Sequence, residues 1–104
     1  MKNSVQKGEV RIISFKKRGL WYSVALEFNI VETGKSFSEA MQQLQESVEG
    51  YVEAVKKANF RPHPLNQIPL KEYEQIWKSH KTKTPKKNVP SPFYVGTLNL
   101  AAYA

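Results

Sequence analysis

The fold is decided by residues 10–28, which have the sequence VRIISFKKRGLWYSVALEF. Residues 10–15 are mostly β-branched or aromatic, which is typical of a strand. From Leu20 to Phe28, apolar residues recur at every second position, the period of a strand with one buried face. The polar residues between the two segments end in Gly19, which adopts a positive φ without strain. We therefore predict that the two segments pair as a β-hairpin.

A long amphipathic helix is expected after this hairpin. A shorter third strand, at about residues 30–33, ends at Gly34. Ser36 and Glu39 then have the spacing of a capping box, in which each side chain accepts a hydrogen bond from the backbone N–H of the other. Gly50 lies inside the helix, and close approach to a strand is one explanation for it. The apolar positions recur at steps of three and four over about 20 residues. They are Phe37, Ala40, Met41, Leu44, Val48, Tyr51, Val52 and Val55.

This order of elements predicts an α+β fold, a three-stranded antiparallel sheet with one long helix packed on a face. We assign residues 1–60 to this module. Residues 61–104 hold all six prolines and carry seven basic side chains against two acidic ones, which indicates a proline-rich basic arm. Within the arm we expect a short helix at about residues 69–79 and a terminal strand at about 93–100. That strand either completes the sheet as an edge strand or pairs with the same strand of a second subunit.

Composition excludes several kinds of site. The chain has no cysteine and no aspartate, so it has no disulfide, no thiolate zinc site and no usual acidic cluster of a metal-dependent nuclease. His63 and His80 are isolated from carboxylates in the sequence, so we predict no metal site, no cofactor, no catalytic residue and no enzyme activity. Neither a long apolar run nor a signal-peptide pattern is present, which predicts a cytoplasmic protein without a membrane span.

Two segments of the arm are candidate binding sites. Leu70, Tyr73 and Trp77 share one face of the short helix, which either packs on the module as satellite core or is presented to a partner protein. Residues 78–88 hold five lysines and no acidic residue, which indicates a solvated loop or, alternatively, a segment that binds phosphates. Stacking on Trp21, Tyr22 or Trp77 would assist such binding if these rings are exposed. The candidate nucleic-acid-binding residues are Lys78, Lys81, Lys83, Lys86 and Lys87.

Two segments and three helix positions carry a family resemblance. They are residues 19–25 (GLWYSVA), residues 31–40 (VETGKSFSEA), Leu44, Val48 and Tyr51. Together they resemble the HicB-like antitoxin domain, over about residues 8–58. The resemblance implies a partial RNase H-like fold without nuclease chemistry. It also implies a protein that binds a small RNA-cleaving HicA-type toxin, covers its active site and assembles into homodimers or higher oligomers.

Charge and domain content refine this expectation. Members of the family often carry a second, DNA-binding domain, but residues 61–104 show no helix-turn-helix pattern. The net charge is +7, whereas a row of glutamates (Glu39, Glu46, Glu49 and Glu53) follows one face of the long helix, which we interpret as a solvated face. We therefore expect a HicB-like antitoxin or an orphan relative that acts by stoichiometric binding. The alternative is a nucleic-acid-binding accessory protein that uses the basic arm.

Overall fold

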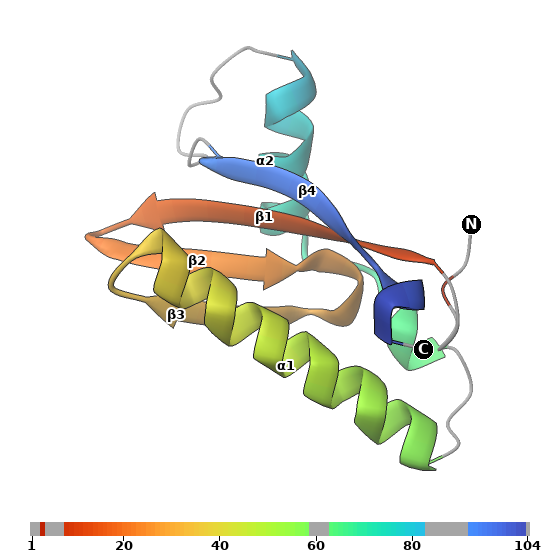
Figure 1. The fold of residues 1–104 in the computed structure, drawn as a ribbon. Helices are drawn as coiled ribbons and strands as arrows, with labels where there is room; N and C mark the ends of the chain where they lie inside the picture. Colours follow the sequence, from red (N-terminus) through yellow and green to blue (C-terminus); the bar gives the residue numbers. More distant parts are fainter. Residues whose placement is uncertain (1–2, 4–7, 59–62, 83–91, 104) are drawn as a thin grey trace.

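The computed structural model describes residues 3, 8–58, 63–82 and 92–103. It has an α+β fold in which a four-stranded antiparallel sheet, of order β3-β2-β1-β4, lies between a long helix α1 and a short helix α2 (Figure 1). The strands are β1 (Glu9–Lys17), β2 (Leu20–Ala25), β3 (Ile30–Gly34) and β4 (Tyr94–Asn99), and the α-helices are α1 (Phe37–Ala58) and α2 (Lys71–Thr82). Three short 3₁₀ helices are η1 (Leu26–Phe28), η2 (His63–Leu65) and η3 (Leu100–Tyr103).

The predicted hairpin is confirmed. β1 and β2 pair antiparallel, and Lys17 lies opposite Leu20, so the turn between them has only two residues. Both turn residues have positive φ, 55° at Arg18 and 79° at Gly19. Two consecutive residues with positive φ are what a type I′ turn requires, and this turn matches the right-handed twist of the strands that it joins. Gly19 therefore has the conformational role that its sequence position indicated.

The second strand is shorter than the pattern predicted. β2 ends at Ala25, and Leu26–Phe28 forms a 3₁₀ turn that closes with a left-handed Asn29, at φ 53°. In a continuous strand Leu26 and Phe28 would face the same side of the sheet. The turn sends them to opposite sides instead: Leu26 packs with the residues that face α2, and Phe28 packs beneath α1. The alternation of apolar and other residues over 20–28 therefore spans two elements: a strand as far as Ala25, and a 3₁₀ turn after it.

The sheet has four strands, not the three that were predicted. β4 pairs antiparallel with β1, with Val10 opposite Leu98 and Ser14 opposite Tyr94. β1 is buried on both faces, since Ile12 and Ile13 point to opposite sides and are each at most 1% exposed. A strand buried in this way needs a neighbour along each edge. The terminal strand therefore completes the sheet of its own chain, which is the first of the two predicted alternatives.

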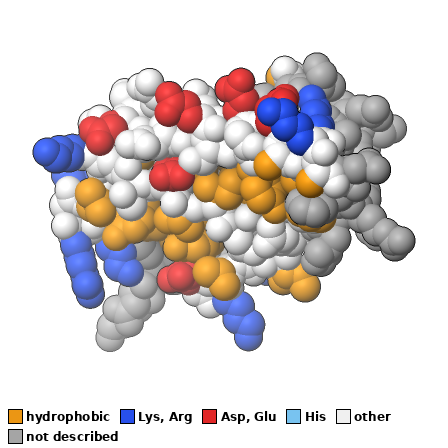
Figure 2. All heavy atoms as spheres, turned by 90° about the horizontal axis from the view of Figure 1, so that it is seen from below, with side chains coloured by type: hydrophobic (Ala, Val, Ile, Leu, Met, Phe, Trp, Pro, Cys, Tyr) orange, Lys and Arg blue, Asp and Glu red, His pale blue; other side chains and the backbone are white. Residues whose placement is uncertain are grey.

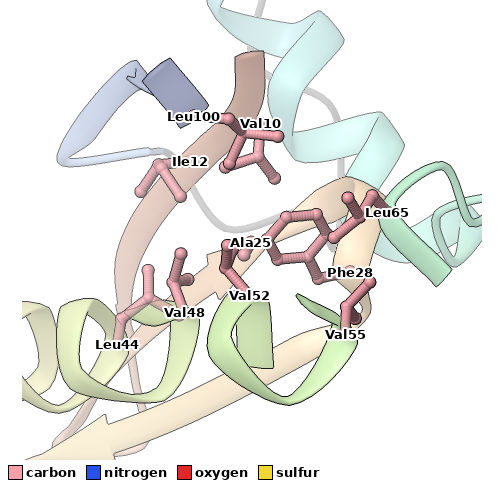
Figure 3. Close-up of a cluster of buried hydrophobic side chains, with 10 residues drawn as sticks. All are labelled: Val10, Ile12, Ala25, Phe28, Leu44, Val48, Val52, Val55, Leu65 and Leu100. Carbon is pink, nitrogen blue, oxygen red and sulfur yellow. The ribbon is translucent and has the colours of Figure 1, made fainter. Parts of the chain in front are cut away.

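The larger hydrophobic core lies between α1 and the sheet (Figure 3). The predicted apolar stripe of α1 is confirmed. One of the two hydrogen bonds of the predicted capping box is present at its start, where the Glu39 N–H donates to the Ser36 Oγ at 3.1 Å. Leu65 and Leu100, from outside residues 1–60, are fully buried in the same core. The buried members are Val10, Ile12, Ala25, Phe28, Leu44, Val48, Val52, Val55, Leu65 and Leu100.

Two glycines, Gly50 within α1 and Gly34 shortly before it, have opposite surroundings. Gly50 is exposed, and a Cβ added there would have no heavy atom within 4 Å, so close approach to a strand does not explain this residue. Gly34 is buried at the end of β3, and a Cβ added there would lie 2.7 Å from the backbone nitrogen of Ala40 and 3.0 Å from the Glu39 side chain. The close approach between helix and sheet is therefore at Gly34.

Replacing each glycine with alanine should change stability in opposite directions. Gly50→Ala is expected to raise the free energy of unfolding by about 0.5–1 kcal/mol, because alanine has the higher helix propensity and the site is open. Gly34→Ala is expected to lower it by about 1–3 kcal/mol, because the helix start must move away from the sheet. Urea denaturation followed by circular dichroism measures both values, and a loss of stability in Gly50→Ala would contradict the first expectation.

Candidate functional site

Helix α2 covers the face of the sheet opposite α1, and it carries Tyr73 and Trp77, two of the three predicted partner-binding residues. The helix begins at Lys71 rather than about residue 69, and Leu70 is 53% exposed at its start. Tyr73 and Trp77 are half-buried and pack against a second core cluster. The structure thus brings Tyr73 and Trp77 together on the sheet and leaves Leu70 in solvent. The buried members of this second core cluster are Ile13, Phe15, Val24, Leu26 and Ile76.

The sequence reasoning missed the residue of α2 that is most deeply buried. Ile76 is 2% exposed and belongs to the second core cluster. It follows Tyr73 by three residues and precedes Trp77 by one, so it widens the apolar stripe toward one side. The spacing of Tyr73 and Ile76 was the signal for it. The predicted set used the positions i, i+3 and i+7 from Leu70, which pass over Ile76 at i+6.

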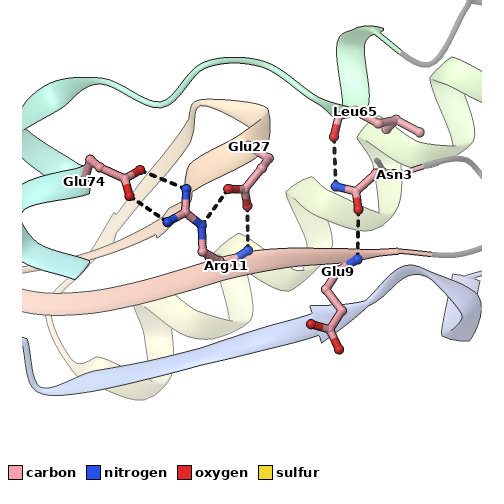
Figure 4. A network of polar contacts seen from close by, with 6 residues as sticks. All are labelled: Asn3, Glu9, Arg11, Glu27, Leu65 and Glu74. Carbon is pink, nitrogen blue, oxygen red and sulfur yellow. Dashed lines mark hydrogen bonds and ion pairs between the residues drawn. The ribbon is translucent and has the colours of Figure 1, made fainter. Parts of the chain in front are cut away.

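A charged network attaches α2 to the sheet, and the sequence reasoning did not identify it (Figure 4). The Arg11 backbone N–H and Nε both donate to the Glu27 carboxylate at 2.7 Å. The two terminal nitrogens of the Arg11 guanidinium donate to the two carboxylate oxygens of Glu74 at 2.7 and 2.8 Å. The guanidinium also lies 5.3 Å from the centroid of the Trp77 ring. Hydrogen bonding to Glu74 raises the pKa of Arg11 above its usual value although partial burial opposes the shift, so the network stays charged on the arginine side.

A second polar cluster fixes the segment that carries Leu65. The Asn3 side chain donates to the Leu65 carbonyl at 2.9 Å and accepts from the Glu9 backbone N–H at 2.8 Å (Figure 4). The Asn3 backbone N–H donates to the Asn66 side-chain oxygen at 2.6 Å, and the Asn66 amide donates back to the Asn3 carbonyl at 2.9 Å. Asn3 is only 3% exposed, so these hydrogen bonds satisfy a buried polar group. The cluster is structural, and it joins the start of β1 to residues 65–66, which lie more than 50 positions later in the chain.

The predicted nucleic-acid-binding lysines are described only in part. Lys78 is exposed on α2, and Lys81 belongs to the same helix, although its side chain is not among those described. Lys83, Lys86 and Lys87 lie outside the described residues. Of the rings proposed for stacking, Trp77 is half-buried under Arg11 and Tyr22 stacks on Phe15 with centroids 5.2 Å apart.

The row of glutamates on α1 is a continuous exposed surface. Glu39, Glu46, Glu49 and Glu53 are all exposed along the face of the helix that points away from the core. Figure 2 shows acidic side chains gathered along this side of the molecule, next to a band of hydrophobic surface. Lys56 lies 3.8 Å from Glu53 and closes the row at the end of the helix. A chain of net charge +7 therefore carries a local acidic face.

Within the described part of the chain, no group of three or more histidine or acidic side chains is arranged to hold a metal ion. None of the helices described there has the length and apolar character needed to cross a bilayer. Comparisons with known protein families, with curated proteins and with solved structures gave no match for this chain.

The packing of Tyr73 predicts that stability decreases at alkaline pH. Burial, with a contribution from Glu72, raises the pKa of Tyr73 above its usual value of 10.0. The folded state then holds the phenol proton more tightly than the unfolded state does. This stabilisation is present below pH 10 and is lost as the pH rises through the folded pKa.

Urea denaturation of the parent chain and of Tyr73→Phe between about pH 8 and pH 11 tests this expectation. The free energy of unfolding should fall more steeply above pH 10 in the parent chain than in the variant. Tyr51, whose pKa burial also raises, contributes to the remaining slope in both proteins. Parallel curves for the two proteins would contradict an interface role for the Tyr73 phenol.

Proposed function

We propose that the chain is a stoichiometric binding protein, a HicB-like antitoxin or an orphan relative, which blocks a small basic RNA-cleaving toxin of the HicA type. The order of three antiparallel strands and a long helix over residues 9–58 supports this proposal. The Ser36 cap at the start of α1, within the segment that carries the resemblance, supports it as well. No residue of this chain performs chemistry in this proposal, because occlusion of the toxin is sufficient.

The acidic face of α1 is the observation that carries the proposal. A toxin that binds RNA is expected to be basic, and association is fastest when surfaces of opposite charge meet. The exposed carboxylates of Glu46 and Glu49 offer such a surface, whereas the whole chain, at net charge +7, would repel a basic protein at long range. We therefore assign the toxin contact to the solvent face of α1.

Capture of partners from the native cells tests this assignment. The tagged chain should retain a small basic protein at equal stoichiometry, identified by mass spectrometry. Glu46→Gln/Glu49→Gln is expected to weaken the complex by about tenfold, mainly through slower association. The matched control, Glu9→Gln/Glu72→Gln, removes two exposed carboxylates elsewhere and should leave the affinity unchanged. Recovery of nucleic acid alone, released by salt, would contradict the antitoxin proposal and favour the accessory protein.

The proposal includes self-association, as the family resemblance implies. In the sheet order, β3 and β4 are the two edge strands, and an edge strand can pair with a second copy. Light scattering of the intact chain should therefore give a mass of at least twice 11.9 kDa. A monomer mass at all protein concentrations would contradict this part of the proposal and leave the toxin contact to be judged by the capture experiment.

A further inference from the structure

Four aromatic side chains form a continuous cluster where the starts of β2, α1 and β4 meet. They are Trp21, Phe37, Phe93 and Tyr94, and we refer to them as the aromatic patch. The centroid of the Phe93 ring lies 4.9 Å from that of Trp21 and 4.9 Å from that of Phe37. Phe37 in turn lies 5.9 Å from both Trp21 and Tyr94. These distances are typical of direct ring contact.

The aromatic patch is open to solvent. Phe93 is 65% exposed and Tyr94 is 38% exposed, while Trp21 and Phe37 are half-buried beneath them. A large ring that is two-thirds exposed contributes little to the stability of the chain itself. Neighbouring aromatic rings that remain exposed are typical of a binding surface rather than of a core.

The backbone around the aromatic patch holds the rings in place. The Phe93 N–H donates to the Ser14 carbonyl at 2.8 Å, which fixes the chain at the start of β4. Gly96 lies two residues after Tyr94 on the same face of the strand, and a Cβ added there would lie 2.5 Å from the Tyr94 hydroxyl. The glycine therefore allows the tyrosine ring to lie along the strand. Rings that are already ordered lose little conformational entropy when a ligand binds.

Positive charge borders the aromatic patch on one side. Lys16, Lys17 and Arg18 are all exposed at the tip of the β1–β2 hairpin. Lys16 lies opposite Trp21 in the strand pairing, and its Nζ is 6.0 Å from the centroid of the tryptophan ring. Glu39 lies at the start of α1 and contributes one opposing carboxylate. The hairpin tip therefore presents net positive charge next to the aromatic patch, with Lys16 on the face of the rings and Lys17 on the opposite face of the sheet.

We propose that the aromatic patch and the hairpin tip form a binding site for single-stranded nucleic acid. Exposed bases stack on aromatic rings regardless of their sequence, and lysine and arginine neutralise the phosphates that link them. A purely apolar protein ligand would have no use for the three cations, which a strand of phosphates satisfies. The site uses none of the arm lysines after Lys78, and it does not include Glu46 or Glu49, the residues tested for the toxin contact, so the two proposals can be tested separately.

Fluorescence anisotropy of the full chain with labelled oligouridine and oligothymidine of about 12 nucleotides tests the proposal, at salt concentrations from about 50 to 200 mM. Both strands should bind, and a duplex of the same length should bind at least about tenfold more weakly, because its bases cannot stack on the protein. Phe93→Ala should weaken binding by about tenfold. Lys16→Gln/Lys17→Gln/Arg18→Asn should reduce the slope of log K against log salt by about 1–2, because each cation that contacts a phosphate of a single strand contributes about 0.7.

Two control variants distinguish binding at this site from non-specific electrostatic binding of nucleic acid to a basic protein. Ile68→Ala removes a side chain that is 88% exposed away from the aromatic patch and should bind like the parent chain. Lys57→Gln/Lys71→Gln/Lys78→Gln removes three exposed cations elsewhere and should retain most of the affinity. Equal losses in the two triple variants, unchanged binding in Phe93→Ala, or duplex binding as tight as single-strand binding would each overturn the proposal. Thermal denaturation confirms that each variant is folded.

Discussion

Replacing Leu65 with alanine is expected to lower the free energy of unfolding by about 2–5 kcal/mol, the usual cost of truncating a buried leucine. Leu65 is fully buried and lies in the core cluster with Phe28 and Val55. Its backbone carbonyl accepts a hydrogen bond from Asn3, and the preceding Pro64 carbonyl accepts one from the Tyr51 hydroxyl at 2.7 Å. Because its surroundings are fixed on several sides, the core has little freedom to close the cavity that alanine would leave.

Leu70→Ala is the matched control for this prediction. It removes the same atoms five positions later, from a side chain that is 53% exposed, and should change the free energy of unfolding by less than about 0.5 kcal/mol. Chemical denaturation followed separately by far-ultraviolet circular dichroism and by tryptophan fluorescence should give one coincident transition for Leu65→Ala. Leu65→Ala and Leu70→Ala chains of equal stability would show that residues 63–65 do not belong to the cooperative core.

Local periodicity predicted the elements that pack through a repeated pattern. The hairpin and α1 each bury one stripe of side chains, so their spacing in the sequence reports their position in the fold. Leu65 has no such pattern. It is a single apolar residue in a 3₁₀ turn of three residues, and only long-range contacts bury it. The same limitation applies to Asn3, whose partners Leu65 and Asn66 are more than 60 positions away.

The fourth strand shows a related limit. The terminal segment was correctly predicted as a strand, because Tyr94 and Val95 favour extended structure. The segment pairs with β1 because β1 requires a second neighbouring strand. This requirement becomes apparent only once β1 is known to be buried on both faces. The aromatic patch depends on the same pairing, since Phe93 meets Trp21 only when β4 lies beside β1.

Loss of the guanidinium of Arg11 is expected to have a similarly large effect. Arg11→Met leaves the carboxylates of Glu27 and Glu74 without their shared cation, between α2 and the sheet. Removing one partner from a fully buried ion pair costs about 3–5 kcal/mol, and the three side chains here are 18–27% exposed, so we expect about 2–3 kcal/mol. Chemical denaturation measures this loss, and a shift in the fluorescence of Trp77, which packs on Arg11, reports the release of α2.

Two further variants show whether the stability lost in Arg11→Met comes from the missing charge or from the changed shape of the side chain. Arg11→Met/Glu27→Gln/Glu74→Gln removes the two carboxylates together with the cation that they share, so it should recover part of the stability that Arg11→Met loses. Lys56→Gln removes the cation of an ion pair that is more open to solvent, 3.8 Å from Glu53, and should cost less than about 0.5 kcal/mol. If Arg11→Met were as mild as Lys56→Gln, the bidentate contact to Glu74 would not be what holds α2 on the sheet. The docking of α2 would then depend mainly on Ile76 and its apolar neighbours, which pack this helix on the sheet.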